Sequence, residues 1–154
     1  MPRPWLLEAG WVATRPSFMT FSFEVRGLES VIATLEEKAP ERIQQYVGRG
    51  LLELAARIVE TVQESMSVSY PPPSAPGEPP HVRTGMLRRS VQIVRAELDE
   101  ATIEVSAPYG APLEFGTSKM EPRPFVAPAL NAAALEAADV VKDAIERNLG
   151  EAVQ

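Results

Sequence analysis

The chain has 154 residues, of which 45% are hydrophobic and 23% charged, which is typical of one globular domain. Its net charge of −6 disfavours tight non-specific binding to nucleic acid, because phosphate contacts need Lys and Arg. There is no Cys and only one His, His81, so disulfides, thiolate nucleophiles and multi-His metal sites within one chain are excluded. No apolar run reaches the roughly 18 residues of a membrane-spanning helix, and we expect no membrane partner.

Residues 1–18 show no clear hydrophobic period. They contain three Pro and two Trp, and Glu8 and Gly10 interrupt the apolar stretch that a signal peptide would need. Two interpretations stay open for this segment: an N-terminal arm, or a start placed too early, with Met19 as the natural first residue. We expect a single folded domain over residues 19–150.

The domain is predicted to begin with a strand and a short helix. Apolar and polar residues alternate over Met19–Arg26, which indicates a half-buried strand that ends at Gly27. Apolar residues then recur at helical spacing over Leu28–Lys38, and Ala39-Pro40 stops this helix because the residue before a proline disfavours helical geometry.

A long helix is predicted from Glu41 to about Met66. One apolar stripe with steps of three or four residues faces a core, and it consists of Ile43, Val47, Leu51, Leu54, Ile58, Val62 and Met66. Gly48 and Gly50 lower the helix propensity of this segment, so we expect them to mark a bend or a close contact with another helix.

A Pro-rich loop is predicted over residues 67–82, which hold six of the 15 prolines. Proline fits neither a helix interior nor a central strand, so the segment is an exposed, extended loop. A structureless segment of this length is functional or disordered in most domains. Thr84 is then the expected N-cap of one or two helical turns.

The rest of the chain is predicted to form a β-hairpin and a final helix. Residues 90–97 and 101–107 alternate in period two and flank a short connection. A short helical turn follows over residues 108–115, then a loop over 116–124. Pro128 opens the last helix, whose expected stop is at Gly150.

This order predicts an α+β domain. It has a small, mostly antiparallel sheet, with one long helix and a C-terminal helix packed on one face, and a long Pro-rich loop. No phosphate-binding glycine loop, zinc-protease motif or nucleophile elbow is present. His81 lies in the Pro-rich loop, which is a poor support for a general base. We therefore expect no enzymatic activity, no catalytic residues and no cofactor or metal.

The charges are unevenly distributed along the sequence. Arg83, Arg88, Arg89 and Arg95 occur with no acid between them, whereas residues 97–121 hold six acids and one Lys. Three interpretations stay open. The charges are ordinary surface charge, or a basic face of one copy meets an acidic face of the next, or the arginines contact nucleic-acid phosphates.

Two stretches carry a resemblance to a known family. The first is PGEPPHVRTGMLRRS at residues 76–90, and the second is YGAPLEFGT at 109–117, followed by RPFVAPAL at 123–130. In this order and at these spacings they resemble the tail-completion, or head–tail joining, family of tailed bacteriophages and prophages. The resemblance covers about residues 19–148, and residues 1–18 depart from the family pattern.

The resemblance implies a structural protein of the virion neck, assembled in the host cytoplasm. It is expected to form a ring, most simply a hexamer, between a head-side connector or stopper and a tail tube or terminator protein. DNA passes through the lumen without sequence-specific binding. A tail terminator that caps the tail tube is a close alternative. A nucleic-acid-binding module that uses the Arg83–Arg95 strip is an alternative of another class.

The charge pattern and the resemblance together point to individual residues. Those expected at interfaces are Arg83, Arg88, Arg89, Arg95, Glu114, Arg123 and Phe125. Those expected to keep turns and local fold are Thr84, Gly85, Gly116 and Thr117. The two glycines are expected where a Cβ would obstruct the backbone, and the two threonines where a turn needs a cap. Glu114 and Arg123 are expected to pair within a subunit or across an interface.

Overall fold

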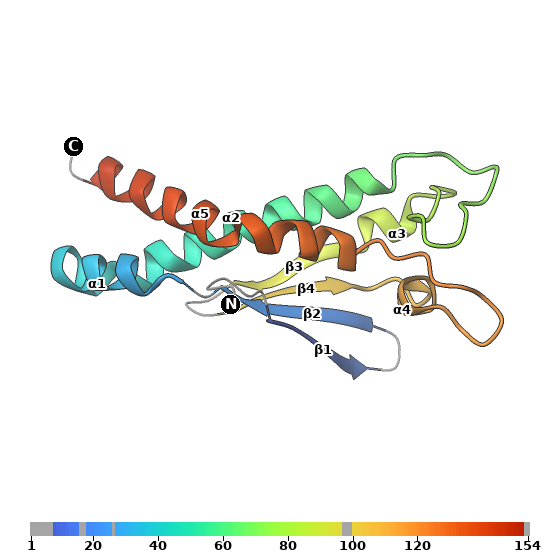
Figure 1. The fold of residues 1–154 in the computed structure, drawn as a ribbon, viewed down its shortest axis with the longest axis horizontal. Helices are drawn as coiled ribbons and strands as arrows, with labels where there is room; N and C mark the ends of the chain where they lie inside the picture. Colours follow the sequence, from blue (N-terminus) through green and yellow to red (C-terminus); the bar gives the residue numbers. More distant parts are fainter. Residues whose placement is uncertain (1–7, 16–17, 26, 97–99, 153–154) are drawn as a thin grey trace.

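The fold is seen in a computed structural model that describes residues 8–15, 18–25, 27–96 and 100–152 (Figure 1). One four-stranded sheet lies beside a layer of helices. The elements in chain order are β1 (Glu8–Arg15), β2 (Phe18–Glu24), α1 (Glu29–Lys38), the 3-10 turn η1 (Pro40–Arg42), α2 (Ile43–Ser65), α3 (Met86–Arg89), β3 (Val91–Ala96), β4 (Ala101–Val105), α4 (Gly110–Phe115) and α5 (Ala127–Ala152).

The sheet has the strand order β1-β2-β4-β3, and each neighbouring pair is antiparallel. β4 lies between β2 and β3, so that Phe21 and Ile93 both pair with Ile103. One face of the sheet is buried because apolar residues alternate along these strands. The other face is polar, and the Ser22 and Thr102 hydroxyls lie 3.1 Å apart on it.

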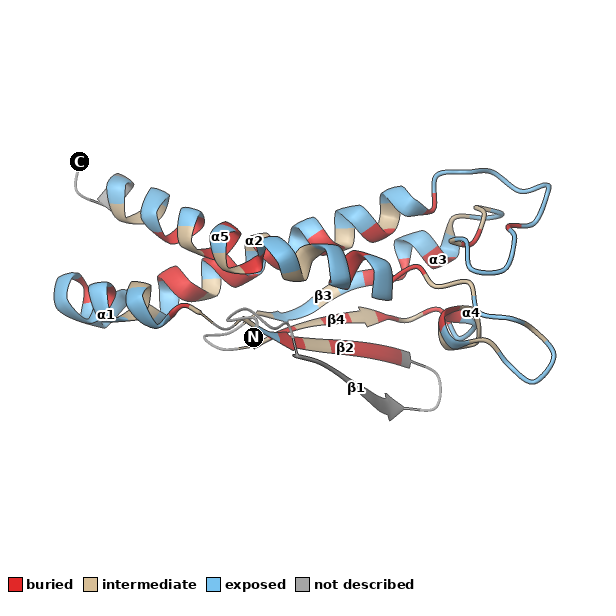
Figure 2. Ribbon diagram, in the orientation of Figure 1, coloured by how far each residue is buried: buried red, intermediate tan, exposed pale blue. Residues whose placement is uncertain are grey.

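α2 and α5 lie over one face of this sheet, and α2 contacts β3 and β4 directly, while α1 and α4 lie toward opposite ends of the molecule (Figure 1). The predicted stripe of α2 forms much of the core, and Figure 2 shows the buried residues gathered between the helices and the sheet. α5 crosses α2 at Gly50, where a Cβ would lie only 2.9 Å from Cγ1 of Val141. The glycines were expected to mark a bend or a close helix contact. Gly50 lies at a close helix contact, whereas Gly48 has open space around it.

The predicted α+β class is confirmed, with the long helix and the C-terminal helix on one face of an antiparallel sheet. None of the described helices combines the length and the apolar character needed to cross a membrane. Two local expectations differ from the structure. α5 continues to Ala152, so Gly150 lies inside the helix and does not end it. The N-cap of α3 is Gly85 rather than Thr84.

The expectation for residues 1–18 is also corrected in part. Residues 8–15 form the edge strand β1, which pairs with β2, so this stretch belongs to the sheet and is not a detached arm. The folded domain therefore begins before residue 19. Residues 1–7 and 16–17 lie outside the described residues. The sequence did not predict this strand because residues 1–18 show no clear hydrophobic period.

Candidate functional site

The segments that carry the family resemblance meet at one end of the molecule. We call this the Pro-loop end and define it as residues 67–90 and 108–126; it contains the Pro-rich loop, α3 and α4 (Figure 1). Backbone contacts join its distant parts, since the Gly77 N–H donates to the Pro122 carbonyl at 2.9 Å. The Arg123 Nε also donates to the Ser74 carbonyl at 3.2 Å.

The Pro-rich loop is tied to itself as well as to its surroundings. The Tyr70 N–H donates to the Val82 carbonyl at 2.8 Å, and the Val82 N–H donates to the Val68 carbonyl at 2.7 Å. His81 Nδ1 lies 2.6 Å from the Pro72 carbonyl oxygen. The loop is thus extended and exposed, as expected, but its two ends are held together by hydrogen bonds. The structure gives His81 a role in shaping this loop.

Glu114 is the buried anchor of the Pro-loop end. Its side chain is 3% exposed, and its carboxylate accepts three backbone N–H groups at the start of α5: Phe125 at 2.8 Å, Val126 at 3.0 Å and Ala127 at 2.8 Å. A carboxylate at a helix N-terminus satisfies otherwise unpaired donors and opposes the helix dipole favourably. The interaction locks α4 to α5.

Glu114 and Arg123 therefore do not make the expected pair within the chain. The Glu114 carboxylate is occupied by the α5 backbone, while Arg123 donates from its side chain to Ser74 and from its backbone to the Leu113 carbonyl at 2.7 Å. Phe125, which was expected at an interface, is 1% exposed and packs in the core of the chain. The opposite charges of Glu114 and Arg123 in the sequence do not reveal this arrangement, because the actual partners of Glu114 are backbone N–H groups.

Gly116 and Thr117 build a tight turn directly after α4. Gly116 has φ +75°, and a Cβ there would lie 2.8 Å from both the Met120 carbonyl oxygen and Cδ of Pro122. Thr117 exchanges backbone hydrogen bonds with Met120, and its hydroxyl accepts the Lys119 N–H at 3.2 Å. Both residues shape the loop that returns to Glu114.

Gly85 and Thr84 play a comparable part before α3. Gly85 has φ +73°, a region that residues with a Cβ rarely adopt. The Thr84 hydroxyl accepts the Met86 N–H at a long 3.4 Å, which is a weak version of the expected cap. The Arg89 Nη2 donates to the Thr84 carbonyl at 3.2 Å, so this arginine also braces the turn.

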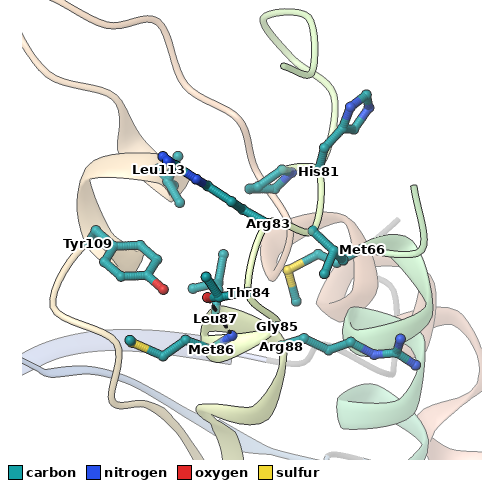
Figure 3. Close-up of a pocket in the computed structure, with 12 residues that line it drawn as sticks. Met66, His81, Arg83, Thr84, Gly85, Met86, Leu87, Arg88, Tyr109 and Leu113 are labelled. Atoms are coloured by element: carbon teal, nitrogen blue, oxygen red, sulfur yellow. Dashed lines mark hydrogen bonds between the residues drawn. The ribbon is translucent and has the colours of Figure 1, made fainter. Parts of the chain in front are cut away.

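The arginines do not form one strip. The Arg83 guanidinium lies over the Tyr70 ring, 5.6 Å from its centre. Figure 3 shows Arg83 extending toward Leu113, whereas Arg88 points the opposite way. Arg95 lies toward the far end of β3, opposite Thr102 of β4. Of these four arginines, Arg83, Arg88 and Arg89 belong to the Pro-loop end, and Arg95 does not.

A small pocket of about 80 Å³ opens at this end, between α3, α4 and the end of α2 (Figure 3). Met66 and Tyr109 point into it from opposite sides. Large apolar side chains are also exposed around it and along the Pro-rich loop, and they are Val68, Tyr70, Met86, Tyr109 and Phe115. A cluster of exposed large apolar residues marks an interaction surface more often than a catalytic site.

The acids of the 97–121 stretch that the structure describes do not gather into a face. Glu114 is buried, Glu104 lies on the sheet, and Glu121 lies in the loop after α4. Glu97 and Asp99 lie outside the described residues. A different acidic surface, not evident from the sequence, is a groove between α2 and α5 lined by Glu53, Glu60, Glu64, Glu136, Asp139 and Asp143. Its members are far apart in sequence and become neighbours only when the two helices cross.

Nothing in the described residues assembles into a metal centre, since no three His, Asp or Glu side chains group closely enough to hold an ion. The comparisons with known proteins add no assignment. No family model matches the chain, and no curated protein or solved structure is similar to it.

Proposed function

We propose that the protein is a structural component of a tailed phage or prophage particle. In this proposal it forms a ring at the head–tail junction, through which DNA passes. The observation that carries the proposal is the convergence of the two stretches of the family resemblance on the Pro-loop end. Segments separated by up to 49 residues, such as Ser74 and Arg123, are joined there by hydrogen bonds.

The residues of the Pro-loop end divide into two groups, which supports an assembly role. Glu114, Gly85, Gly116 and Thr117 hold the backbone in place. Val68, Tyr70, Met86, Tyr109 and Phe115 remain exposed on the frame that results. A rigid frame that presents large apolar side chains is what a protein–protein contact needs, because few rotamers are lost on binding.

The nucleic-acid-binding alternative has less support. Direct phosphate contact requires several guanidinium groups on one exposed face. Arg95 lies apart from the other three arginines, Arg89 braces a turn, and Arg83 is stacked on Tyr70. In the proposed role the DNA passes through the lumen of the ring, so the chain needs no site that binds it tightly.

The proposal is tested by deleting the gene from the phage or prophage that encodes it. We expect electron microscopy to show DNA-filled heads and separate tails, and the wild-type chain supplied in trans to restore joined particles. The Met86→Asp variant, which puts a charge on the exposed surface of the Pro-loop end, is expected to fail in this complementation. Leu52→Asp, at a similarly exposed leucine on α2, is the matched control and is expected to complement. Joined, infectious particles without the gene would contradict the proposal.

A further inference from the structure

The groove between α2 and α5 is an unassigned surface with a distinct chemical character. It comprises two adjoining hollows of about 580 and 460 Å³ that share Arg57, Glu136 and Val140. We call it the α2–α5 groove. The α5 side of the larger hollow is lined by Ala129, Ala132 and Ala133, whose short side chains leave space beside α2. The groove therefore combines apolar side chains with a larger set of charged ones.

The rim carries six carboxylates and two guanidinium groups. Arg147 binds Glu53 through both carboxylate oxygens at 2.7 and 2.8 Å, and Arg57 approaches the same carboxylate at 3.9 Å. The arginines thus converge on one acid. Among the described residues, five rim acids are left without an ionic or hydrogen-bonded partner: Glu60, Glu64, Glu136, Asp139 and Asp143.

The Pro-loop end carries charges of the opposite sign. Its exposed apolar residues Met86 and Tyr109 lie beside Arg83 and Arg88 around the small pocket (Figure 3). The Arg88 side chain is exposed, and its guanidinium has no partner among the described residues. The two surfaces therefore match in both respects: each combines exposed apolar residues with charges, and the arginines of one are opposite in sign to the acids of the other.

We propose that the Pro-loop end of one copy docks into the α2–α5 groove of a second copy. The inference rests on the proposed function, because it assigns the two surfaces through which copies in the ring meet. Two different patches of one chain make a heterologous, head-to-tail contact, and such contacts close into rings when the rotation between copies permits. The acidic partner of the arginines is thus the helical groove and not the 97–121 stretch.

The test is a charge swap read by the mass of the full-length chain in solution. The end-reversed variant carries Arg83→Glu and Arg88→Glu, and the groove-reversed variant carries Glu60→Lys and Glu136→Lys. Each alone brings like charges together, so we expect its self-association to weaken by about tenfold or more. Mixed in equal amounts, the two variants again place opposite charges at every contact, and association should return. A chain with all four changes should also associate.

A matched control separates specific contact from net charge. Glu29→Lys with Glu36→Lys makes the same charge change as the groove reversal, on exposed positions of α1, and should associate like the wild type. Thermal unfolding of each variant checks that it remains folded. Restoration by mixing cannot arise from misfolded chains, so it supports the contact even if a single variant is destabilised.

Two results would overturn the inference. One is a wild-type chain that stays monomeric at every soluble concentration. The other is association that both reversals leave unchanged, which would mean that copies meet through other surfaces. Neither result removes the proposed neck function, because a chain can join heads to tails through other contacts, and the gene deletion tests that function separately. Conversely, a confirmed charge swap in a chain that is not needed for joined particles would keep the contact and reject the neck role.

Discussion

The crossing pair α2 and α5 and the Pro-loop end are held together in different ways. α2 buries a regular stripe of aliphatic side chains, from Val47 to Met66, against the sheet and α5. The Pro-loop end has little regular structure and depends on single polar contacts, such as the three hydrogen bonds to Glu114. The stability of the first region is spread over many contacts, whereas that of the second is concentrated in a few.

This difference has a consequence for mutation. A stripe of many similar contacts loses one part of its energy when one side chain is truncated. A region held by a few polar contacts loses its geometry when one donor or acceptor is removed. The buried groups that were bonded to it are then left without a hydrogen-bond partner. We therefore expect single polar changes at the Pro-loop end to act on stability and on assembly together.

The largest effect is expected at Glu114. Glu114→Ala leaves three backbone N–H groups at the start of α5 without their acceptor, and it should lower the free energy of unfolding by about 3 kcal/mol. Urea denaturation followed by circular dichroism measures this. Glu146→Ala, at an exposed position of α5, is the matched control and should change stability by less than about 0.5 kcal/mol. Equal effects of the two would show that the buried carboxylate does not anchor the frame.

A smaller effect is expected where α2 meets α5. Gly50→Ala places a methyl group 2.9 Å from Cγ1 and 3.1 Å from the carbonyl oxygen of Val141, so the helices must separate, at a cost of about 2 kcal/mol. The same change at Gly48 meets open space, and it should stabilise the helix by roughly 0.5–1 kcal/mol. Opposite shifts in the melting temperature are the expected result. Shifts of the same sign would contradict the close crossing.

The smallest effect is expected at Arg123. Arg123→Ala removes the side-chain hydrogen bond to the Ser74 carbonyl and should cost about 1 kcal/mol of global stability. The local effect should be larger, since this contact ties the Pro-rich loop to the segment before α5. Limited proteolysis is expected to cut the loop faster in the variant than in the wild type. Unchanged cleavage would show that the backbone contacts alone, such as Gly77 to Pro122, hold the loop.

Most of the fold follows from the sequence because periodicity reports burial. The α2 stripe and the alternation in β2 and β4 each match a buried face. β1 was not predicted, since residues 1–18 show no clear period-two alternation. The end of α5 was misplaced because Gly150 is exposed on the last turns of a helix, where tertiary contacts do not penalise it.

The site was predictable only in part. The motif residues locate the Pro-loop end correctly as a region, and Gly116 stands where a Cβ would strike the backbone. The roles of charged residues were not predictable from opposite signs along the chain. Glu114 bonds to backbone donors, and the α2–α5 groove forms from acids on two helices that the Pro-rich loop and the sheet separate in sequence. Both the partners of Glu114 and the groove depend on which residues come close in three dimensions, and a charge pattern along the chain does not show this.

The central claim is that the Pro-loop end is buried when the protein assembles, and thiol labelling tests it most directly. The chain has no Cys, so Met86→Cys places a single reactive group on this end, at a side chain that is 51% exposed. Glu36→Cys on α1 is the control. We expect both thiols to react with a maleimide dye in the free chain, and only the α1 thiol to react in the assembled particle. Equal labelling of the two positions in the particle would contradict the account.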